Sequence, residues 1–129
     1  MRRIIPVFLA LLLLTACAAP AREATYRQID MQEAIAMMEE ESGYIILDVR
    51  TPEEFSERHI PGAINIPNET IGSDEIAGLP DKDQLILVYC RSGNRSKQAS
   101  QKLAESGYTN VVEFGGINDW PGETVSGAE

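Results

Sequence analysis

The sequence predicts an α/β domain in which a mostly parallel central sheet carries helices on both faces. Two apolar runs indicate strands of this sheet: Leu85–Tyr89 has no polar residue, and Tyr44–Val49 is broken only by Asp48 near its end. Such runs are typical of strands that are buried on both faces of a parallel sheet. Helical patterns alternate with these runs, which also favours a parallel sheet. A chain of 129 residues has the length of about one domain, which we place at residues 25–129.

Helix-capping residues mark the first two predicted helices. Asp30 and Glu33 fit a capping box, and apolar residues follow them at helical spacing. Thr51 fits the N-cap of a second helix, with Pro52 at its first position and Glu54 able to complete another capping box. The start of each helix is therefore defined by the sequence.

A third helix and a short strand are expected towards the C-terminus. The helix is predicted over residues 94–106 or 96–106, and Gly107 is suited to a left-handed cap. Val111–Phe114 has the character of a last strand, after which Gly115–Gly116 is expected to turn the chain back. Short helices and turns are expected between the second helix and the strand that precedes Cys90.

The N-terminal segment differs in composition from the rest of the chain. Arg2 and Arg3 precede an apolar run of 11 residues, Ile4–Leu14, which is the pattern of a secretory signal peptide. A transmembrane helix needs roughly 20 apolar residues, so this run is too short for a stable span. We therefore expect residues 1–16 to be a signal peptide.

The end of the apolar run suggests an anchor. Leu14–Cys17 resembles the lipobox of bacterial lipoproteins, which implies cleavage before Cys17, lipid on Cys17, and a tether over residues 17–24. An ordinary signal cut at the Ala-x-Ala site Ala16–Ala18 is the alternative. Both interpretations imply an exported protein, and the lipobox adds a membrane anchor that faces the periplasm or the cell exterior.

The mature chain is expected to be strongly acidic. The whole sequence has 11 Lys and Arg against 20 Asp and Glu, and removal of the signal peptide takes away Arg2 and Arg3. This balance opposes binding to nucleic acid and to anionic membrane surfaces. We therefore expect no nucleic-acid partner.

Cysteine usage indicates a single reactive thiol. The sequence has two cysteines, and if Cys17 carries lipid through its sulfur, Cys90 is the only thiol of the mature chain. Neither a disulfide partner nor a resolving cysteine would then remain. This excludes a dithiol oxidoreductase of the Cys-x-x-Cys kind.

Cys90 follows an apolar strand and precedes a helix, a position at which open α/β sheets form their sites. Successive N–H groups of such a loop can point at one anion, and the helix N-terminus adds partial positive charge. These groups and neighbouring arginines can lower the pKa of a thiol from about 8.5 into a range of roughly 3.5–7.5. We expect Cys90 to be the nucleophile. The loop residues expected to bind substrate are Arg91, Ser92, Gly93, Asn94, Arg95 and Ser96.

The charge pattern around Cys90 favours an anionic substrate. Between Asp83 and Glu105 lie 21 residues with four bases and no acid, although the chain is acidic elsewhere. The alternative interpretation of the same residues is a buried structural cysteine beside a solvated helix face. The loop that follows Cys90 favours the first interpretation.

Four ordered motifs resemble those of rhodanese-domain sulfurtransferases. Cys90–Ser96 is similar to the active-site loop of that family, and the other three are Leu47–Phe55, His59–Pro67 and Gly115–Trp120. The resemblance covers roughly residues 25–122. It implies a rhodanese-like α/β fold and sulfurtransferase activity.

The same resemblance implies a two-step reaction. The Cys90 thiolate takes the sulfane sulfur of a small anionic donor such as thiosulfate and becomes a persulfide, and an acceptor then removes that sulfur. The implied acceptors are a thiol, a protein cysteine or cyanide. Loop N–H groups would stabilise the thiolate and the persulfide, while Arg91 and Arg95 would attract the donor. Neither an organic cofactor nor a metal is implied.

Three polar residues of the other motifs have competing interpretations. Asp48 and Arg50 lie at the mouth of the neighbouring strand, where they could contact substrate, but their expected role is to tie the Thr51 helix to the sheet. His59 could be a general base for Cys90. The family resemblance implies instead that His59 serves the fold.

Two other functions would use the same residues. The first is a phosphatase or arsenate reductase. Cell-cycle phosphatases share the rhodanese fold and use the motif Cys-x5-Arg, whereas only four residues separate Cys90 from Arg95 here. The shorter loop fits a sulfur atom better than a phosphoryl group. A non-catalytic module would hold a persulfide on Cys90 or record its oxidation, and the lack of a resolving thiol leaves this alternative open.

Overall fold

The computed structural model describes residues 24–72 and 75–128. The predicted signal peptide over residues 1–16 and the predicted lipid site at Cys17 lie outside these residues, as does the tether except for Ala24. None of the helices in the described ranges is long and apolar enough to cross a membrane.

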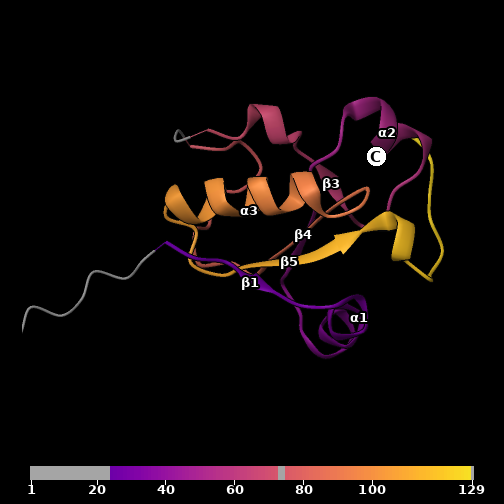
Figure 1. Cartoon of the computed structure of the whole chain (residues 1–129), viewed down its shortest axis with the longest axis horizontal. Helices are drawn as coiled ribbons and strands as arrows, with labels where there is room; N and C mark the ends of the chain where they lie inside the picture. Colours follow the sequence, from indigo (N-terminus) through magenta and orange to yellow (C-terminus); the bar gives the residue numbers. More distant parts are fainter. Residues whose placement is uncertain (1–23, 73–74, 129) are drawn as a thin grey trace, which may run out of the picture.

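Five parallel strands form one sheet in the order β1-β5-β4-β2-β3, so β4 lies at its centre (Figure 1). Leu47 of β2 is in register with Val88 of β4, and Cys90 at the end of β4 is in register with Gly116 of β5. The predicted parallel sheet is therefore confirmed. The strands are β1 (Arg27–Gln28), β2 (Ile45–Asp48), β3 (Ile64–Asn65), β4 (Ile86–Cys90) and β5 (Val111–Gly116).

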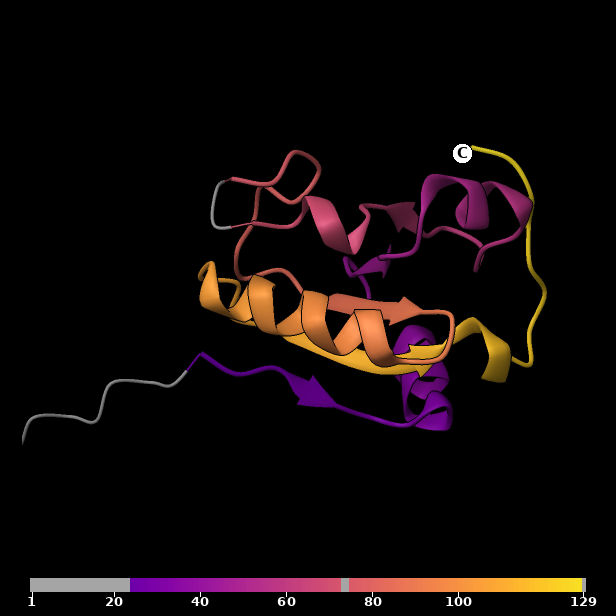
Figure 2. The same cartoon turned by 45° about the horizontal axis from the view of Figure 1, so that its top comes forward.

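Helices pack on both faces of the sheet, as the sequence predicts (Figures 1 and 2). Ala99 and Leu103 of α3 pack in one core cluster with the strands, whereas Ala34 of α1 and Phe55 of α2 pack in a second cluster. The side chains of β4 alternate between the two clusters, because successive strand residues point to opposite faces. The helices are α1 (Met31–Glu40), α2 (Pro52–Glu57), α3 (Asn94–Glu105) and the 3-10 helices η1 (Asn68–Thr70) and η2 (Ile117–Asp119).

Both predicted capping boxes are present. The Asp30 carboxylate accepts the Glu33 N–H at 2.8 Å, and the Thr51 hydroxyl accepts the Glu54 N–H at 3.2 Å. In each box the glutamate also accepts the N–H of the N-cap residue. Only three residues separate the end of β2 from the start of α2, so this helix lies close to the carboxyl edge of the sheet.

Two short strands and one turn differ from the sequence prediction. β1 and β3 were not predicted, because a strand of two residues is too short to show any periodicity. The prediction that Gly115–Gly116 turns the chain back is wrong, since both glycines belong to β5 and the chain turns into η2 only after them. Cys90 is itself the last residue of β4 rather than the first residue after it.

Candidate active site

Cys90 lies at the carboxyl end of the central strand, with β2 on one side and β5 on the other. Arg91, Ser92 and Gly93 connect it to α3, which begins at Asn94. Gly93 has a φ of 111°, a backbone conformation that residues with a Cβ rarely adopt. This turn brings the N–H of Gly93 to 3.0 Å from Cys90 Sγ, so the loop curls back over the sulfur.

The surroundings of the Cys90 sulfur favour the thiolate overall. The residue is only 1% exposed, and this burial alone would raise the pKa of the thiol. Hydrogen bonds at Ser96, Gly93 and Ser92 outweigh burial and lower the pKa below its usual value. The loop backbone thus directs the Gly93 N–H at the sulfur.

A buried carboxylate lies beneath the loop. Ser96 Oγ is 3.4 Å from Cys90 Sγ and 2.8 Å from Glu113 Oε1, so the hydroxyl connects the sulfur to the carboxylate. Glu113 is on β5, is 3% exposed, and also accepts the N–H of Gly115 at 2.8 Å. The sequence alone does not indicate a role for Glu113, because an acid inside a predicted strand gives no sign that its side chain contacts a residue 17 positions away.

The second glycine of β5 lies directly against the backbone of the loop. A Cβ on Gly116 would overlap the carbonyl group of Arg91 and the N–H of Ser92. The φ of Gly116 is −141°, so it is the lack of space that requires glycine. Asn118 of η2 then donates its N–H to the Arg91 carbonyl at 3.2 Å, which holds the loop from the same side.

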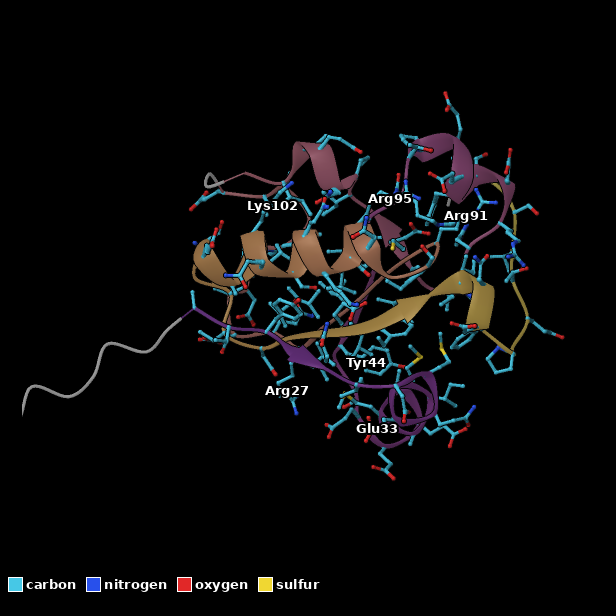
Figure 3. The ribbon with its side chains drawn as sticks, in the orientation of Figure 1. Arg27, Glu33, Tyr44, Arg91, Arg95 and Lys102 are labelled. Atoms are coloured by element: carbon cyan, nitrogen blue, oxygen red, sulfur yellow. The ribbon has the colours of Figure 1, made fainter. Side chains whose placement is uncertain are left out.

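Arg95 is paired with an acid from another helix. Its guanidinium donates to the two carboxylate oxygens of Glu54 at 2.6 and 3.0 Å, and the side chains are 28% and 25% exposed. Hydrogen bonding from Arg95 is the main reason that the pKa of Glu54 falls to about 2. Figure 3 shows Arg91 and Arg95 between the start of α3 and α2. Although the sequence around Cys90 contains no acid, the folded site therefore contains a carboxylate from α2.

Asp48 and Arg50 make contacts within the fold. The Arg50 guanidinium donates to Asp48 Oδ2 at 2.7 Å and to the carbonyl of Arg58, the residue that ends α2, at 2.7 Å. The pair thereby joins the end of β2 to the end of α2. His59 is buried, stacks on Phe55 with a centroid distance of 3.7 Å, and its Nδ1 lies 2.8 Å from the Phe55 carbonyl oxygen.

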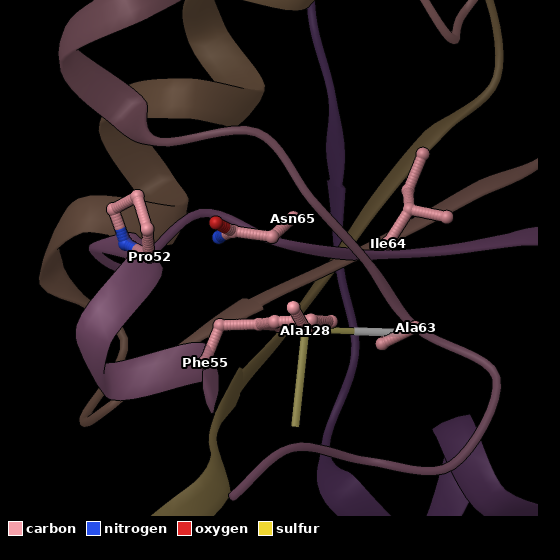
Figure 4. Close-up of a pocket in the computed structure, with 6 residues that line it drawn as sticks. All are labelled: Pro52, Phe55, Ala63, Ile64, Asn65 and Ala128. Atoms are coloured by element: carbon pink, nitrogen blue, oxygen red, sulfur yellow. The ribbon is translucent and has the colours of Figure 1, made fainter. Parts of the chain in front are cut away.

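Two pockets near α2 differ in chemistry. The pocket in Figure 4 contains no residue of the Cys90 loop and is lined by Pro52, Phe55, Ala63, Ile64, Asn65 and Ala128. The other borders the loop through Arg91, and its remaining lining residues are Arg50, Glu54, Glu57, Arg58, Ile117 and Asn118. Across residues 24–72 and 75–128, no three His, Cys, Asp or Glu residues are grouped to hold a metal ion. We therefore assign the candidate site to the Cys90 loop and the charged pocket beside it.

The sequence matches the rhodanese-like domain family over residues 30–123. The chain belongs to this family. Thiosulfate sulfurtransferase PspE of Escherichia coli (strain K12) is 42% identical over 73 residues, which are 57% of this chain and 70% of PspE. Thiosulfate sulfurtransferase GlpE of Pseudomonas entomophila (strain L48) is 34% identical over 107 residues, which are 79% of this chain and 94% of GlpE. This rhodanese is accordingly an enzyme of the sulfurtransferase class.

A solved structure supports the same assignment of the fold. A structure described as a rhodanese with anions from E. coli is 41% identical and superposes with a TM-score of 0.59. The match covers 65% of this chain and 99% of that chain. The rhodanese-like α/β fold that the motifs implied is therefore confirmed.

Some of the predicted site residues contact the Cys90 sulfur, whereas others lie exposed at the edge of the site. The sulfur of Cys90 accepts the N–H of Gly93 at 3.0 Å and lies 3.4 Å from the Ser96 hydroxyl oxygen. Arg91 is exposed at the charged pocket, and Asn94 is an exposed first residue of α3. Substrate contact by these residues stays a prediction, as it does for Arg95, Asp48 and Arg50.

Proposed function

We propose that this rhodanese transfers sulfane sulfur from a small anionic donor to a thiol or cyanide through a persulfide on Cys90. The observation that carries the proposal is the Cys90 sulfur itself, which ends the central strand under backbone N–H donors that lower its pKa. Thiosulfate is the donor we favour, because PspE and GlpE are both named thiosulfate sulfurtransferases.

In the first step the Cys90 thiolate attacks the outer, sulfane sulfur of thiosulfate. A new S–S bond forms at Cys90, the S–S bond of thiosulfate breaks, and sulfite leaves with the electron pair of that bond. The negative charge then rests on the outer sulfur of the persulfide. The N–H groups of Ser92, Gly93 and Ser96 favour this step, because preorganised donors stabilise an anion without having to rearrange.

In the second step an acceptor thiolate or cyanide attacks the outer sulfur of the persulfide. The S–S bond to Cys90 breaks, and Cys90 leaves as a thiolate, so the cycle needs neither an oxidant nor a reductant. A lowered pKa makes Cys90 a good leaving group here, because thiols of lower pKa leave faster. We propose a small thiol or a protein cysteine as the acceptor in the cell.

Replacement of Cys90 tests the proposal. Cys90→Ser and Cys90→Ala should both abolish sulfur transfer from thiosulfate to cyanide, because they remove the nucleophile. Far-UV circular dichroism and a urea unfolding curve serve as the control that the variants remain folded. Transfer at the wild-type rate by either folded variant would contradict a persulfide on Cys90.

We further propose that the enzyme works outside the cytoplasm, held to a membrane by lipid on Cys17. The proposal rests on Arg2 and Arg3, on the apolar run Ile4–Leu14 and on the lipobox-like Leu14–Cys17. In cells, Cys17→Ser should leave the protein unprocessed or release it from the membrane fraction. Mature wild-type protein without lipid, identified by intact mass, would refute the anchor but not export.

A further inference from the structure

The Ser96 hydroxyl is surrounded by more hydrogen-bond acceptors than its single proton can reach at one time. Its oxygen lies 2.8 Å from Glu113 Oε1, 2.9 Å from the Gly93 carbonyl oxygen and 3.4 Å from Cys90 Sγ. A serine hydroxyl has a single proton to donate, together with lone pairs that can accept. Whichever group takes that proton decides whether Ser96 donates to the Cys90 sulfur or accepts from it.

The carboxylate and the sulfur are also close enough to interact as charges. The distances from Ser96 Oγ to each group, 3.4 and 2.8 Å, keep Cys90 Sγ and Glu113 Oε1 within about 6 Å of each other. At this separation two negative charges disfavour each other, and burial of both residues keeps water from screening the effect. A charged Glu113 therefore opposes a thiolate at Cys90.

We propose that Glu113 is a positioning residue that controls the reactivity of Cys90 through Ser96. The Ser96 hydroxyl donates its hydrogen bond to the Glu113 carboxylate, so the Ser96 oxygen is left to accept a hydrogen bond from the thiol of Cys90. This inference rests on the sulfur-transfer role proposed for Cys90. Glu113 favours the thiol in the free enzyme, whereas the N–H groups of the loop favour the thiolate.

The arrangement favours the sulfur-loaded enzyme. In the persulfide the negative charge lies on the outer sulfur, while Cys90 Sγ is bonded on both sides and no longer competes for the Ser96 proton. Glu113 therefore opposes the thiolate more strongly than it opposes the persulfide. Glu113 therefore makes the persulfide enzyme more stable relative to the free thiolate enzyme.

Other charged groups surround this pair, and none of them belongs to the Ser96 link. Arg95 is held by Glu54, and Arg50 is held by Asp48. A change at Glu113 leaves these pairs in place, so it alters one charge near the sulfur. The remaining charged residues of the two pockets beside the loop are Arg91, Glu57 and Arg58 in one and, in the pocket that Glu113 lines, Asp30, Lys97 and Asp119.

The test is the rate of Cys90 alkylation by iodoacetamide between pH 5 and pH 10, which reports the thiolate whether or not the protein transfers sulfur. Glu113→Gln keeps the size of the side chain and removes its charge. We expect this variant to react roughly tenfold faster than wild type at pH 6, because loss of a like charge at this range lowers the pKa of the thiol. Glu105→Gln, an exposed site at the end of α3, is the matched control and should leave the rate unchanged.

Ser96→Ala separates a link through the hydroxyl from a simple charge effect. If Glu113 accepts the Ser96 hydrogen bond, the hydroxyl favours the thiol, so Ser96→Ala alone should leave the alkylation rate unchanged or raise it by about threefold at most. In the Glu113→Gln background the hydroxyl is free to donate to the thiolate, so adding Ser96→Ala there should cost roughly tenfold. The effects of the two substitutions are thus expected to be strongly non-additive.

Several results would overturn the proposal. Folded Glu113→Gln that reacts at the wild-type rate, or more slowly, would make Glu113 a structural residue only. Ser96→Ala that alone slows alkylation threefold or more would show that the Ser96 hydroxyl donates to the sulfur in the wild type, and this variant decides the matter even where Glu113→Gln does not fold. Sulfur transfer without Cys90 would instead refute the proposed function and leave these alkylation results unaffected.

Discussion

The two sides of the Cys90 loop are built from different interactions. On the buried side, Ser96 and Glu113 form short hydrogen bonds beneath the sulfur, and Gly116 lies directly against the loop backbone. On the exposed side, Arg91 is open to solvent, and Arg95 is paired with Glu54 at about one-quarter exposure. Each side brings one carboxylate to the loop, and only the one on β5 is shielded from water.

The difference separates two tasks within one small site. Charges on the exposed side interact through water and salt, so they act on the approach of the donor and their effect falls as ionic strength rises. Groups on the buried side are fixed in position and poorly screened, so they act on the protonation state of the sulfur. Substitutions on the two sides should therefore change different measurements.

The largest effect is expected from closing the space between β5 and the loop. Gly116→Ala places a methyl group on the Arg91 carbonyl, and because both groups are backbone, neither can move aside cheaply. We expect a loss of about 3 kcal/mol or more in the free energy of unfolding, measured in urea, together with loss of sulfur transfer. Gly72→Ala, with nothing within 4 Å of the added carbon, is the control and should stay within about 0.5 kcal/mol of wild type. Equal stability of the two variants would show that β5 does not support the loop.

An intermediate effect is expected on the exposed side. Glu54→Gln leaves the Arg95 guanidinium without its partner charge, so an anionic donor should be attracted more strongly. We expect the KM for thiosulfate to fall about threefold at low salt and the difference to vanish near 1 M salt, where the Debye length is about 3 Å. Arg95→Gln leaves Glu54 negative and should raise KM. Identical KM values for the three proteins at low salt would exclude a role for this pair in donor binding.

The smallest effect is expected in the acid stability of the same pair. The pKa of Glu54 is lowered to about 2 in the folded protein, against about 4.3 for a free glutamate, so its stabilising effect is complete above pH 5. It should disappear as the pH falls towards 2, when the folded protein also takes up the proton. Because the pair is partly exposed, we expect the free energy of unfolding of the wild type to exceed that of Glu54→Gln by only about 0.5 kcal/mol at pH 6. A difference that stays constant from pH 6 to pH 3 would contradict this assignment.

Local sequence signals were sufficient for the parts of the site that are contiguous in the chain. The capping box at Thr51, the strand that ends at Cys90 and the helix that follows Gly93 all depend on residues within a few positions of one another. The fold class followed from the same signals, because buried parallel strands leave long apolar runs.

The acids of the site could not be predicted in the same way. The hydrogen bond between Arg95 and Glu54 joins residues 41 positions apart in the sequence, and the one between Ser96 and Glu113 joins residues 17 positions apart. The first contact depends on where α2 packs beside α3, and the second depends on the pairing of β5 with β4. The stretch around Cys90 contains no acid in the sequence. The folded chain nevertheless places Glu54 and Glu113 beside it, because residues distant in sequence pack against the loop.

Mass spectrometry of the intact mature protein after incubation with thiosulfate shows directly whether Cys90 carries a persulfide. We expect the wild type to gain the mass of one sulfur atom, cyanide or a thiol to remove it, and Cys90→Ser to gain nothing. A wild-type protein whose Cys90 alkylates readily but takes up no sulfur, or sulfur uptake by Cys90→Ser, would refute sulfur transfer through Cys90.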